Sequence, residues 1–271
     1  MIRVATIARN PLDSPNMTAN DAAILGQIGV LLKKRGAEVV QIKENEDIPQ
    51  EVDVVCTMSR TASTLQRLKD AEARGIRVIN PTIAVERCSR RLFMEILSNS
   101  GIPQPKYKVI ENSDELLDDC FPCWIKKADG WNNYKEDVTF AHTKDEAIAA
   151  IRQLESRGIS LFIQMQHCQG DIIKFYGIGK HFFHYCRPTT GKFGHEEFNG
   201  TQKNYTFDAE KLRKHAQTAA KAIGLAIYGG DAIITPEGDI FTIDLNDFPS
   251  FTAIREEAAE MIVKLIMDKT E

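Results

Sequence analysis

The sequence between Gly230 and Asn246 reads GDAIITPEGDIFTIDLN. Two apolar runs stand on either side of the turn-forming residues 236–238, so this stretch predicts a β-hairpin. A two-residue or a four-residue loop sets Asp231 directly opposite Asp244, with Cβ atoms roughly 5 Å apart. Asn246 shares that face of the hairpin because side chains alternate along a strand. A three-residue bulged loop would shift the pairing by one residue and separate the two carboxylates.

The shared face of this hairpin carries two carboxylates and one amide oxygen. The two carboxylates repel each other at close range unless a cation lies between them. Oxygen ligands of this composition suit Mg²⁺, which takes one or two carboxylates and completes its shell with substrate phosphates. The sequence therefore predicts a magnesium site at Asp231, Asp244 and Asn246. The alternative is a hairpin whose acidic residues lie on a solvated face.

Upstream of the hairpin, residues 1 to 80 alternate between apolar strands and periodic helices that end at glycine. This alternation predicts an α/β fold with a doubly wound parallel sheet. The expected strands cover 4–8, 38–42, 52–56 and 76–79, and the expected helices cover 20–35 and 61–74. Residues 81–102 predict one helix that ends before Pro103. Because Arg9 follows the first strand where a glycine-rich turn would stand, this layer lacks a dinucleotide-binding fingerprint.

The overall composition excludes several classes of protein. The chain has 271 residues, 34 basic and 38 acidic side chains and a formal net charge of −4, so binding to a nucleic-acid backbone is not expected. No apolar run approaches the roughly 18 residues of a membrane span, and the N-terminus does not resemble a signal peptide. Cys120 and Cys123 lack the second pair that a structural zinc site needs. With six scattered cysteines, the expected location is the reducing cytoplasm.

Several motifs, in their order along the chain, resemble those of ATP-grasp enzymes. The matching stretches are FPCWIK at 121–126, ADG at 128–130, LFIQM at 161–165, GDIIKFYGIG at 170–179 and DLNDFP at 244–249. In that family they correspond to the phosphate-contacting strand, the loop over the phosphates, the hinge beside adenine and ribose, the substrate strand and the metal-binding strand. The resemblance covers roughly residues 85–265.

The resemblance implies roles for individual residues. Asp231, Asp244 and Asn246 would hold Mg²⁺, as two ions or with Mn²⁺ in their place, against ATP. The nucleotide would be contacted by Arg90, Lys126, Asp129, Gly130, Gln164 and Met165. Lys174 and Arg187, on adjacent predicted strands, would be the catalytic cations that act on the acceptor and on the transferred phosphoryl group. The alternative for this last pair is two solvated strand ends.

The resemblance also implies an α+β ATP-grasp fold in three segments. Residues 1–85 would form the substrate-side α/β domain, residues 86–165 the linker helix and the small subdomain, and residues 166–271 the large subdomain with the metal site. The single-glycine loop at 129–134 would act as a lid over the phosphates.

Two reactions fit these motifs. In the first, ATP phosphorylates a carboxylate and an amine displaces the phosphate, as in ligases that resemble glutathione synthase or the ribosomal-protein glutamate ligases. In the second, an alcohol receives the phosphoryl group and keeps it, as in the inositol trisphosphate kinases. Asp244, Lys174 and the Asn246-x-Phe248-Pro249 run resemble the corresponding motifs of those kinases. We place the ligase first and the kinase second. A non-catalytic nucleotide-binding regulator is the third possibility.

The acceptor is expected to be an anionic or amino-acid-like small molecule. The sequence predicts that Arg9, Asn10, Ser59 and Arg60 contribute to its pocket, together with the loop at 189–203. His167, after the hinge strand, is a further candidate contact. Neither nucleic acid nor a membrane is expected as a partner, and the protein is expected to be a monomer or a homodimer.

Overall fold

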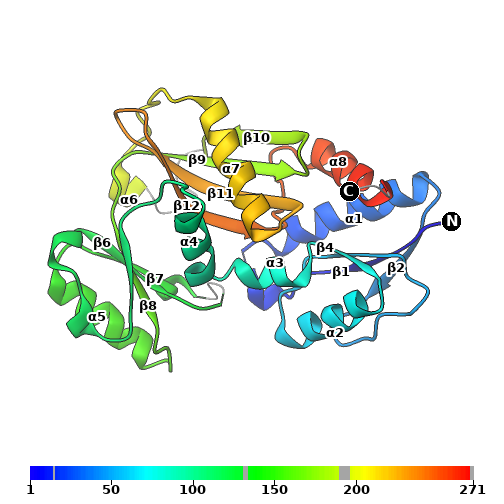
Figure 1. Ribbon diagram of the computed structural model, residues 1–271, viewed down its shortest axis with the longest axis horizontal. Helices are drawn as coiled ribbons and strands as arrows, with labels where there is room; N and C mark the ends of the chain where they lie inside the picture. The colour runs from blue at the N-terminus through cyan, green and yellow to red at the C-terminus, as the bar shows by residue number, and fades with distance from the viewer. Residues whose placement is uncertain (15, 131–133, 189–195, 269–271) are drawn as a thin grey trace.

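The computed structural model describes residues 1–14, 16–130, 134–188 and 196–268. Within these residues the strands form three sheets of four strands each, which follow one another along the chain (Figure 1). The N-terminal sheet is parallel, and the second and third sheets are antiparallel. The mixed α/β fold class expected from the sequence is therefore confirmed.

The N-terminal sheet is doubly wound. It contains β1 (Arg3–Ile7), β2 (Glu38–Ile42), β3 (Val54–Thr57) and β4 (Arg77–Ile79) in the order β2-β1-β3-β4. Alternate residues of each strand face opposite sides, so Val4 packs with α1 (Thr18–Lys34) and Val55 packs with α2 (Ala62–Ala73). The two helices therefore cover opposite faces, and the carboxyl ends of the strands meet at one edge.

The single helix expected over residues 81–102 is wrong. The structure has two helices, α3 (Thr82–Arg87) and α4 (Arg90–Asn99). Ser89 takes an extended conformation, with φ −58° and ψ 138°, and starts the second helix. The break sets Arg90 in the first turn of α4, where its Nη1 donates a hydrogen bond to the carbonyl of Lys127 at 2.8 Å.

The second sheet contains β5 (Tyr107–Ile110), β6 (Cys123–Lys127), β7 (Val138–Ala141) and β8 (Phe162–Gln166) in the order β5-β8-β6-β7. Helix α5 (Lys144–Glu155) covers one face of it, where Ile125 and Phe162 belong to the same buried cluster as Ile151 and Leu154. Thr143 caps this helix by accepting a hydrogen bond from the backbone of Glu146. The opposite face of the sheet is left for the third sheet and the site.

The third sheet contains β9 (Asp171–Ile178), β10 (Phe182–Cys186), β11 (Ile227–Ile234) and β12 (Ile240–Asp247) in the order β10-β9-β11-β12. Helix α7 (Ala209–Ile223) packs on one face, against Ile173 and Phe175. The remaining short helices are η1 (Pro11–Asp13), η2 (Ser113–Glu115), η3 (Asp118–Cys120), η4 (Lys135–Asp137) and α6 (Glu196–Asn199). Strand β12 is an edge strand with β11 as its neighbour.

The C-terminal helix α8 (Arg255–Met267) joins the third sheet to the N-terminal layer. It lies beside α1 (Figure 1), and Ile262 shares a buried cluster with Ile28 of α1 and Ile178 of β9. Asn80, just after β4, adds a polar link, because its side chain accepts from the backbone of Ala226 and Ile227 and donates to the carbonyl of Ile227. The domain boundaries after residues 85 and 165 stay a prediction. None of the described helices is long and apolar enough to cross a membrane.

Candidate active site

The β11–β12 hairpin sets Asp231 directly opposite Asp244, as predicted. The loop is not the expected one, because Pro236–Gly238 form a three-residue loop with Gly238 at φ +86°. That loop shifts the pairing by one residue, so that Ala232 pairs with Thr242. A second irregularity between Asp231 and Ala232 leaves one extra residue on β12 and restores the register. The two shifts cancel at the carboxylates.

A glycine beside the carboxylates allows this close arrangement. A Cβ atom on Gly230 would lie 2.3 Å from the carbonyl oxygen of Asp244 and 2.5 Å from the ring of Phe175. No side chain fits at that position without displacing backbone. Gly230 therefore lets β11 pack closely between its two neighbouring strands next to Asp231.

The face that carries Asp231 and Asp244 also carries Lys174. Lys174 pairs with Asp231 in the β9–β11 register, and its Nζ lies 2.8 Å from Oδ1 of that carboxylate. Burial opposes the charge of Lys174, but the carboxylate outweighs burial and raises the pKa of the lysine. On β12, the amide of Asn246 donates to Oδ2 of Asp244 at 2.9 Å. The structure thus brings four of the predicted site residues to one cluster.

The donor set of this cluster suits a magnesium ion that also binds phosphate. Among the described residues, no three His, Cys, Asp or Glu side chains are grouped to hold a metal by themselves. The cluster offers two carboxylates and an amide oxygen, and all three are hard oxygen donors. Mg²⁺ is commonly held by one or two carboxylates, with substrate phosphates completing its shell. Asp231, Asp244 and Asn246 fit that requirement.

Lys126 approaches the same cluster from the second sheet. It is buried on β6, and its Nζ lies 3.6 Å from the sulfur of Met165. Burial and the nearby charge of Arg90 lower the pKa of Lys126 to about 7, while Asp244 and Asp231 act in the opposite direction. Burial also lowers the pKa of Arg90, again opposed by Asp244. A buried lysine and a partly buried arginine therefore lie near the two carboxylates, an arrangement that favours an anionic ligand.

A small cavity separates the second and third sheets beside Lys126. Trp124, Met165 and His167 line it on one side, and Ile233 and Ile243 line it on the other. Its volume of about 50 Å³ is small beside the roughly 300 Å³ or more of a typical ligand pocket. A nucleotide base would therefore need the two sheets to open further. Phe198 packs edge-on against Trp124, with ring centroids 4.9 Å apart, and joins the third sheet's long loop to the second sheet.

Two residues predicted to contact the nucleotide lie at the edge of this region. Asp129 forms an ion pair with Arg91 at 3.1 Å, and Gly130 takes a left-handed φ of +71°. The rest of the predicted lid includes residues 131–133, which lie outside the described residues. The lid stays a prediction.

The structure does not bring Gln164 to the cavity, although its neighbour Met165 lines it. The side chain of Gln164 is fully buried on the opposite face of β8, where it accepts from the backbone N–H of Leu117 and donates to the carbonyl of Leu117. Its amide is thus engaged in joining β8 to the segment before β6. Alternation along the strand explains why one of two adjacent residues faces the site.

The structure also does not bring Arg187 to Lys174. Arg187 Nη1 lies 2.8 Å from Asp171, and its Nη2 donates to the carbonyl of Tyr205. Asp171 and Lys174 are three residues apart on β9, so their side chains lie on opposite faces of the sheet. The structure therefore separates the two predicted catalytic cations, and their catalytic roles stay predictions.

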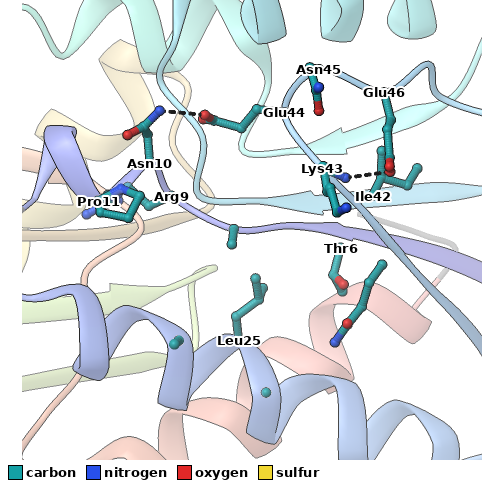
Figure 2. A pocket seen from close by; sticks show the side chains of 14 residues that line it. Thr6, Arg9, Asn10, Pro11, Leu25, Ile42, Lys43, Glu44, Asn45 and Glu46 are labelled. Atoms are coloured by element: carbon teal, nitrogen blue, oxygen red, sulfur yellow. Dashed lines mark hydrogen bonds between the residues drawn. The ribbon is translucent and has the colours of Figure 1, made fainter.

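The N-terminal layer contains a larger cleft, of about 750 Å³. Arg9 and Asn10 line it, as do Leu25 of α1 and the segment 41–46 that ends β2 (Figure 2). Asn10 donates to the Glu44 carboxylate at 2.8 Å. The other two residues predicted for the substrate pocket do not line this cleft. Ser59 donates to Glu44, and Arg60 contacts Asp247.

A buried ionic cluster at the carboxyl edge of the N-terminal sheet was not predicted from the sequence. Arg9 and Arg60 share Asp247, and Arg9 also lies 3.5 Å from Asp21. Burial and the neighbouring Arg60 lower the pKa of Arg9 to about 10, which leaves the guanidinium charged. The polar residues that directly follow the apolar strands were the sequence signal for such a cluster. The shared partner of Arg9 and Arg60, Asp247, is far away in the sequence.

Together these features define an α/β protein with a cationic and carboxylate-lined site between two antiparallel sheets. No family model matches the sequence, and no curated protein does. Solved structures do match over almost the whole chain. The D-alanine–D-alanine ligase from Bacillus anthracis complexed with ATP is similar with a TM-score of 0.72 and 16% identity, over 97% of each chain.

Two further solved structures have the same architecture. The RimK domain protein ATP-grasp from Sphaerobacter thermophilus has a TM-score of 0.74 and 16% identity, over 98% of this chain and 100% of the other. The ATP-grasp ligase PsnB, complexed with a minimal precursor, has a TM-score of 0.70 and 14% identity, over 97% and 99% of the two chains. The protein therefore has the ATP-grasp fold, as the motifs in its sequence predicted.

Proposed function

We propose that this protein is an ATP- and Mg²⁺-dependent ligase that joins a carboxylate to an amine through an acyl phosphate. One observation carries the proposal: Asp231, Asp244, Asn246 and Lys174 lie together on one sheet face, with Lys126 and Arg90 close to the carboxylates. The fold supports it, because the structures compared above include ligases and one of them binds ATP.

Each residue of the cluster has a distinct part in this reaction. Asp231, Asp244 and Asn246 would hold Mg²⁺, which when bound with ATP neutralises phosphate charge and orients the phosphates. Lys126 of β6 and Arg90 of α4 would bind the phosphates. Lys174, already paired with Asp231, would neutralise the charge that develops on the transferred phosphoryl group.

The overall reaction has two bond exchanges. A carboxylate oxygen of the substrate bonds to the γ-phosphorus as the bond from that phosphorus to the ADP oxygen breaks. An amine nitrogen then bonds to the activated carbonyl carbon, phosphate leaves, and the amine loses a proton to solvent or to phosphate. No protein nucleophile is required, so catalysis would rest on positioning and charge neutralisation.

The cleft beside Arg9 and Asn10 is the proposed place for an amino-acid-like or anionic small substrate. It lies at the carboxyl ends of β1 and β2, where ligands bind in open α/β sheets. Its wall holds Glu44 in one orientation through Asn10 and Ser59. A fixed carboxylate of this kind would suit the amino group of such a substrate.

The test is a product screen. Purified protein is incubated with ATP, Mg²⁺ and pooled amino acids, short peptides or inositol phosphates, and products are identified by mass. A condensation product with release of ADP supports the ligase. A mass gain of one phosphate would replace the ligase with a kinase. ATP bound without turnover of any pool would favour the non-catalytic regulator. The Asp244→Ala variant is the negative control.

A further inference from the structure

Asp247 lies immediately after the proposed metal ligand Asn246, at the end of β12. Its side chain faces the opposite way from Asn246, as neighbouring residues on a strand do, and it is 1% exposed. Nη2 of Arg60 lies 2.5 Å from Oδ1 of this carboxylate, and Nη2 of Arg9 lies 3.8 Å from Oδ2. The two arginines follow β1 and β3 of the N-terminal sheet. One buried carboxylate thus joins the N-terminal layer to the end of the metal-binding strand.

The same arginines also hold the backbone of this strand end. Nη2 of Arg9 donates to the carbonyl of Phe248 at 2.9 Å and to that of Asp247 at 3.3 Å. Nη2 of Arg60 donates to the carbonyl of Asp247 at 3.2 Å. Arg9 is itself fixed, since its Nε donates to the carbonyl of Met58. These contacts fix the chain, and not only a side chain, one residue beyond Asn246.

This strand end needs such support for two reasons. Strand β12 is at the edge of its sheet, so β11 holds it from one side. The chain then turns through Phe248 and Phe251 at φ +40° and +47°, a region that side chains other than glycine rarely adopt. Both phenylalanines are buried, so the turn is held by its surroundings. The arginines supply the polar part of that support.

We propose that Arg9, Arg60 and Asp247 are positioning residues that hold Asn246 in the geometry that binds the metal ion. The inference rests on the proposed function and adds a role for the N-terminal layer in the metal site itself. A buried ion pair adds little net stability compared with apolar side chains of the same size, but it fixes one arrangement of the groups that it joins. Partners that orient metal ligands in this way commonly change metal affinity by ten- to a hundredfold when they are removed.

The test measures Mn²⁺ binding to the full chain in the presence of a non-hydrolysable ATP analogue, by electron paramagnetic resonance of free Mn²⁺. Asp247→Asn keeps the size of the side chain and removes its charge. We expect Mn²⁺ affinity to fall by about tenfold or more. Affinity for the analogue measured without metal is expected to stay within about threefold, because Arg9 and Arg60 do not line the small cavity beside Lys126.

A matched control exists on the same sheet. Arg77 of β4 donates to the carbonyls of Leu265 and Asp268 at 3.0 Å, so it too joins the N-terminal layer to a later element through backbone carbonyls. Arg77→Lys disturbs such a link away from the metal site. It is expected to leave Mn²⁺ affinity within about twofold. Equal losses in Arg77→Lys and Asp247→Asn would show a general structural effect and would overturn the positioning role.

The remaining outcomes separate the two proposals. If the parent protein binds Mn²⁺ and Asp247→Asn binds it equally well, the positioning role is overturned while the proposed function stands. If the parent does not bind Mn²⁺ with the analogue, the proposed metal site fails and the inference fails with it. Should Asp247→Asn not fold, Arg60→Lys carries the same test, because it keeps the positive charge and removes Nη2, the atom that contacts both the carboxylate and the carbonyl of Asp247.

Discussion

Strand β9 carries two ion pairs of equal length on its two faces. Lys174 lies 2.8 Å from Asp231 on one face, and Asp171 lies 2.8 Å from Arg187 on the other. Their surroundings differ. Asp171 also accepts hydrogen bonds from the backbone N–H groups of Lys203 and Tyr205, so its charge is fully used in tying the two ends of a long loop together. Asp231 instead faces a second carboxylate, Asp244.

The difference shows how to tell a structural pair from a functional one at equal distance. On the Asp171 face, Asp171 and Arg187 both have protein partners beyond each other. On the Asp231 face, two carboxylates and Lys174 meet Lys126 from the second sheet, and the pKa of Lys126 is lowered to about 7 by burial and by the nearby Arg90. Unbalanced charge of this kind is a property of sites that bind ions or charged ligands. We call the face of β9 that carries Lys174 and Asp231 the open face, and the face that carries Asp171 and Arg187 the closed face.

The largest effect is expected on the open face at Asp244. Asp244→Ala removes a proposed Mg²⁺ ligand, so turnover measured by ADP release should fall by about a thousandfold or more. Stability to urea should stay equal to the parent or rise, because the variant removes a carboxylate directly opposite Asp231. Turnover within tenfold of the parent would contradict the metal assignment and would make the open face structural as well.

Lys174→Ala is expected to have the next largest effect. If Lys174 stabilises the phosphoryl group mainly during transfer, turnover falls by roughly a hundredfold, or about 2.7 kcal/mol, with ATP affinity changed less than about threefold. Steady-state kinetics gives the turnover number, and calorimetry gives the affinity. An equal loss in both quantities would instead indicate a lysine that binds nucleotide in the ground state.

Arg187→Ala tests the closed face and should give the opposite pattern. Turnover is expected to stay within about threefold of the parent, since the guanidinium lies on the far side of β9. The variant leaves the buried Asp171 without its cation. Because Arg187 is partly exposed, we expect the free energy of unfolding to fall by about 2 kcal/mol rather than the larger cost of a fully buried pair. Urea denaturation measures it. A hundredfold loss of turnover with unchanged stability would erase the distinction between the faces.

The sequence predicted the open face better than the closed one, for a physical reason. Asp231 and Asp244 lie on the two adjacent strands of one hairpin, so they are related by local pairing, which the sequence displays. Even so, Asp231 meets Asp244 through a three-residue loop and a compensating irregularity in β12, and neither was expected. The doubly wound layer was predicted for the same reason, since periodicity and glycine stops are local signals.

The positions of Gln164 and Arg187 depend on relations that the sequence does not display. Whether Gln164 or Met165 faces the cavity depends on which side of β8 the third sheet covers, and the side of Arg187 depends on its pairing with β9. The contact between Arg60 and Asp247 joins residues 187 positions apart. No local pattern identifies such a partner, so the contacts of Arg9 and Arg60 with the strand end were not predicted, while Arg9 also lines the cleft proposed for the substrate.

Lys126 sharpens the comparison with a smaller effect. Lys126 is buried near the carboxylates of the open face and is proposed to bind the phosphates. Lys126→Met should therefore weaken ATP binding by about tenfold, the value of one charge-assisted hydrogen bond. Calorimetry with a non-hydrolysable analogue measures this. Lys69→Met removes an exposed lysine paired with Glu86 and serves as the control. Unchanged affinity in Lys126→Met would place the phosphates elsewhere.

The smallest expected effect is a proton taken up when nucleotide binds. In the free protein the pKa of Lys126 is about 7, so at pH 8 the amine is mostly neutral. Phosphates placed next to it favour the ammonium form and raise its pKa, so the complex binds more protons than the free protein. We therefore expect uptake of about 0.5 to 0.9 proton at pH 8, and much less at pH 6, where the amine is already charged.

Calorimetry in buffers of different ionisation enthalpy measures the uptake, and the difference between the parent and Lys126→Met isolates this lysine from protons bound by the nucleotide. Equal uptake by the two proteins at pH 8 would mean that the buried cation of the open face keeps its charge without a ligand, and the contrast between the faces of β9 would then rest on Asp231 and Asp244 alone.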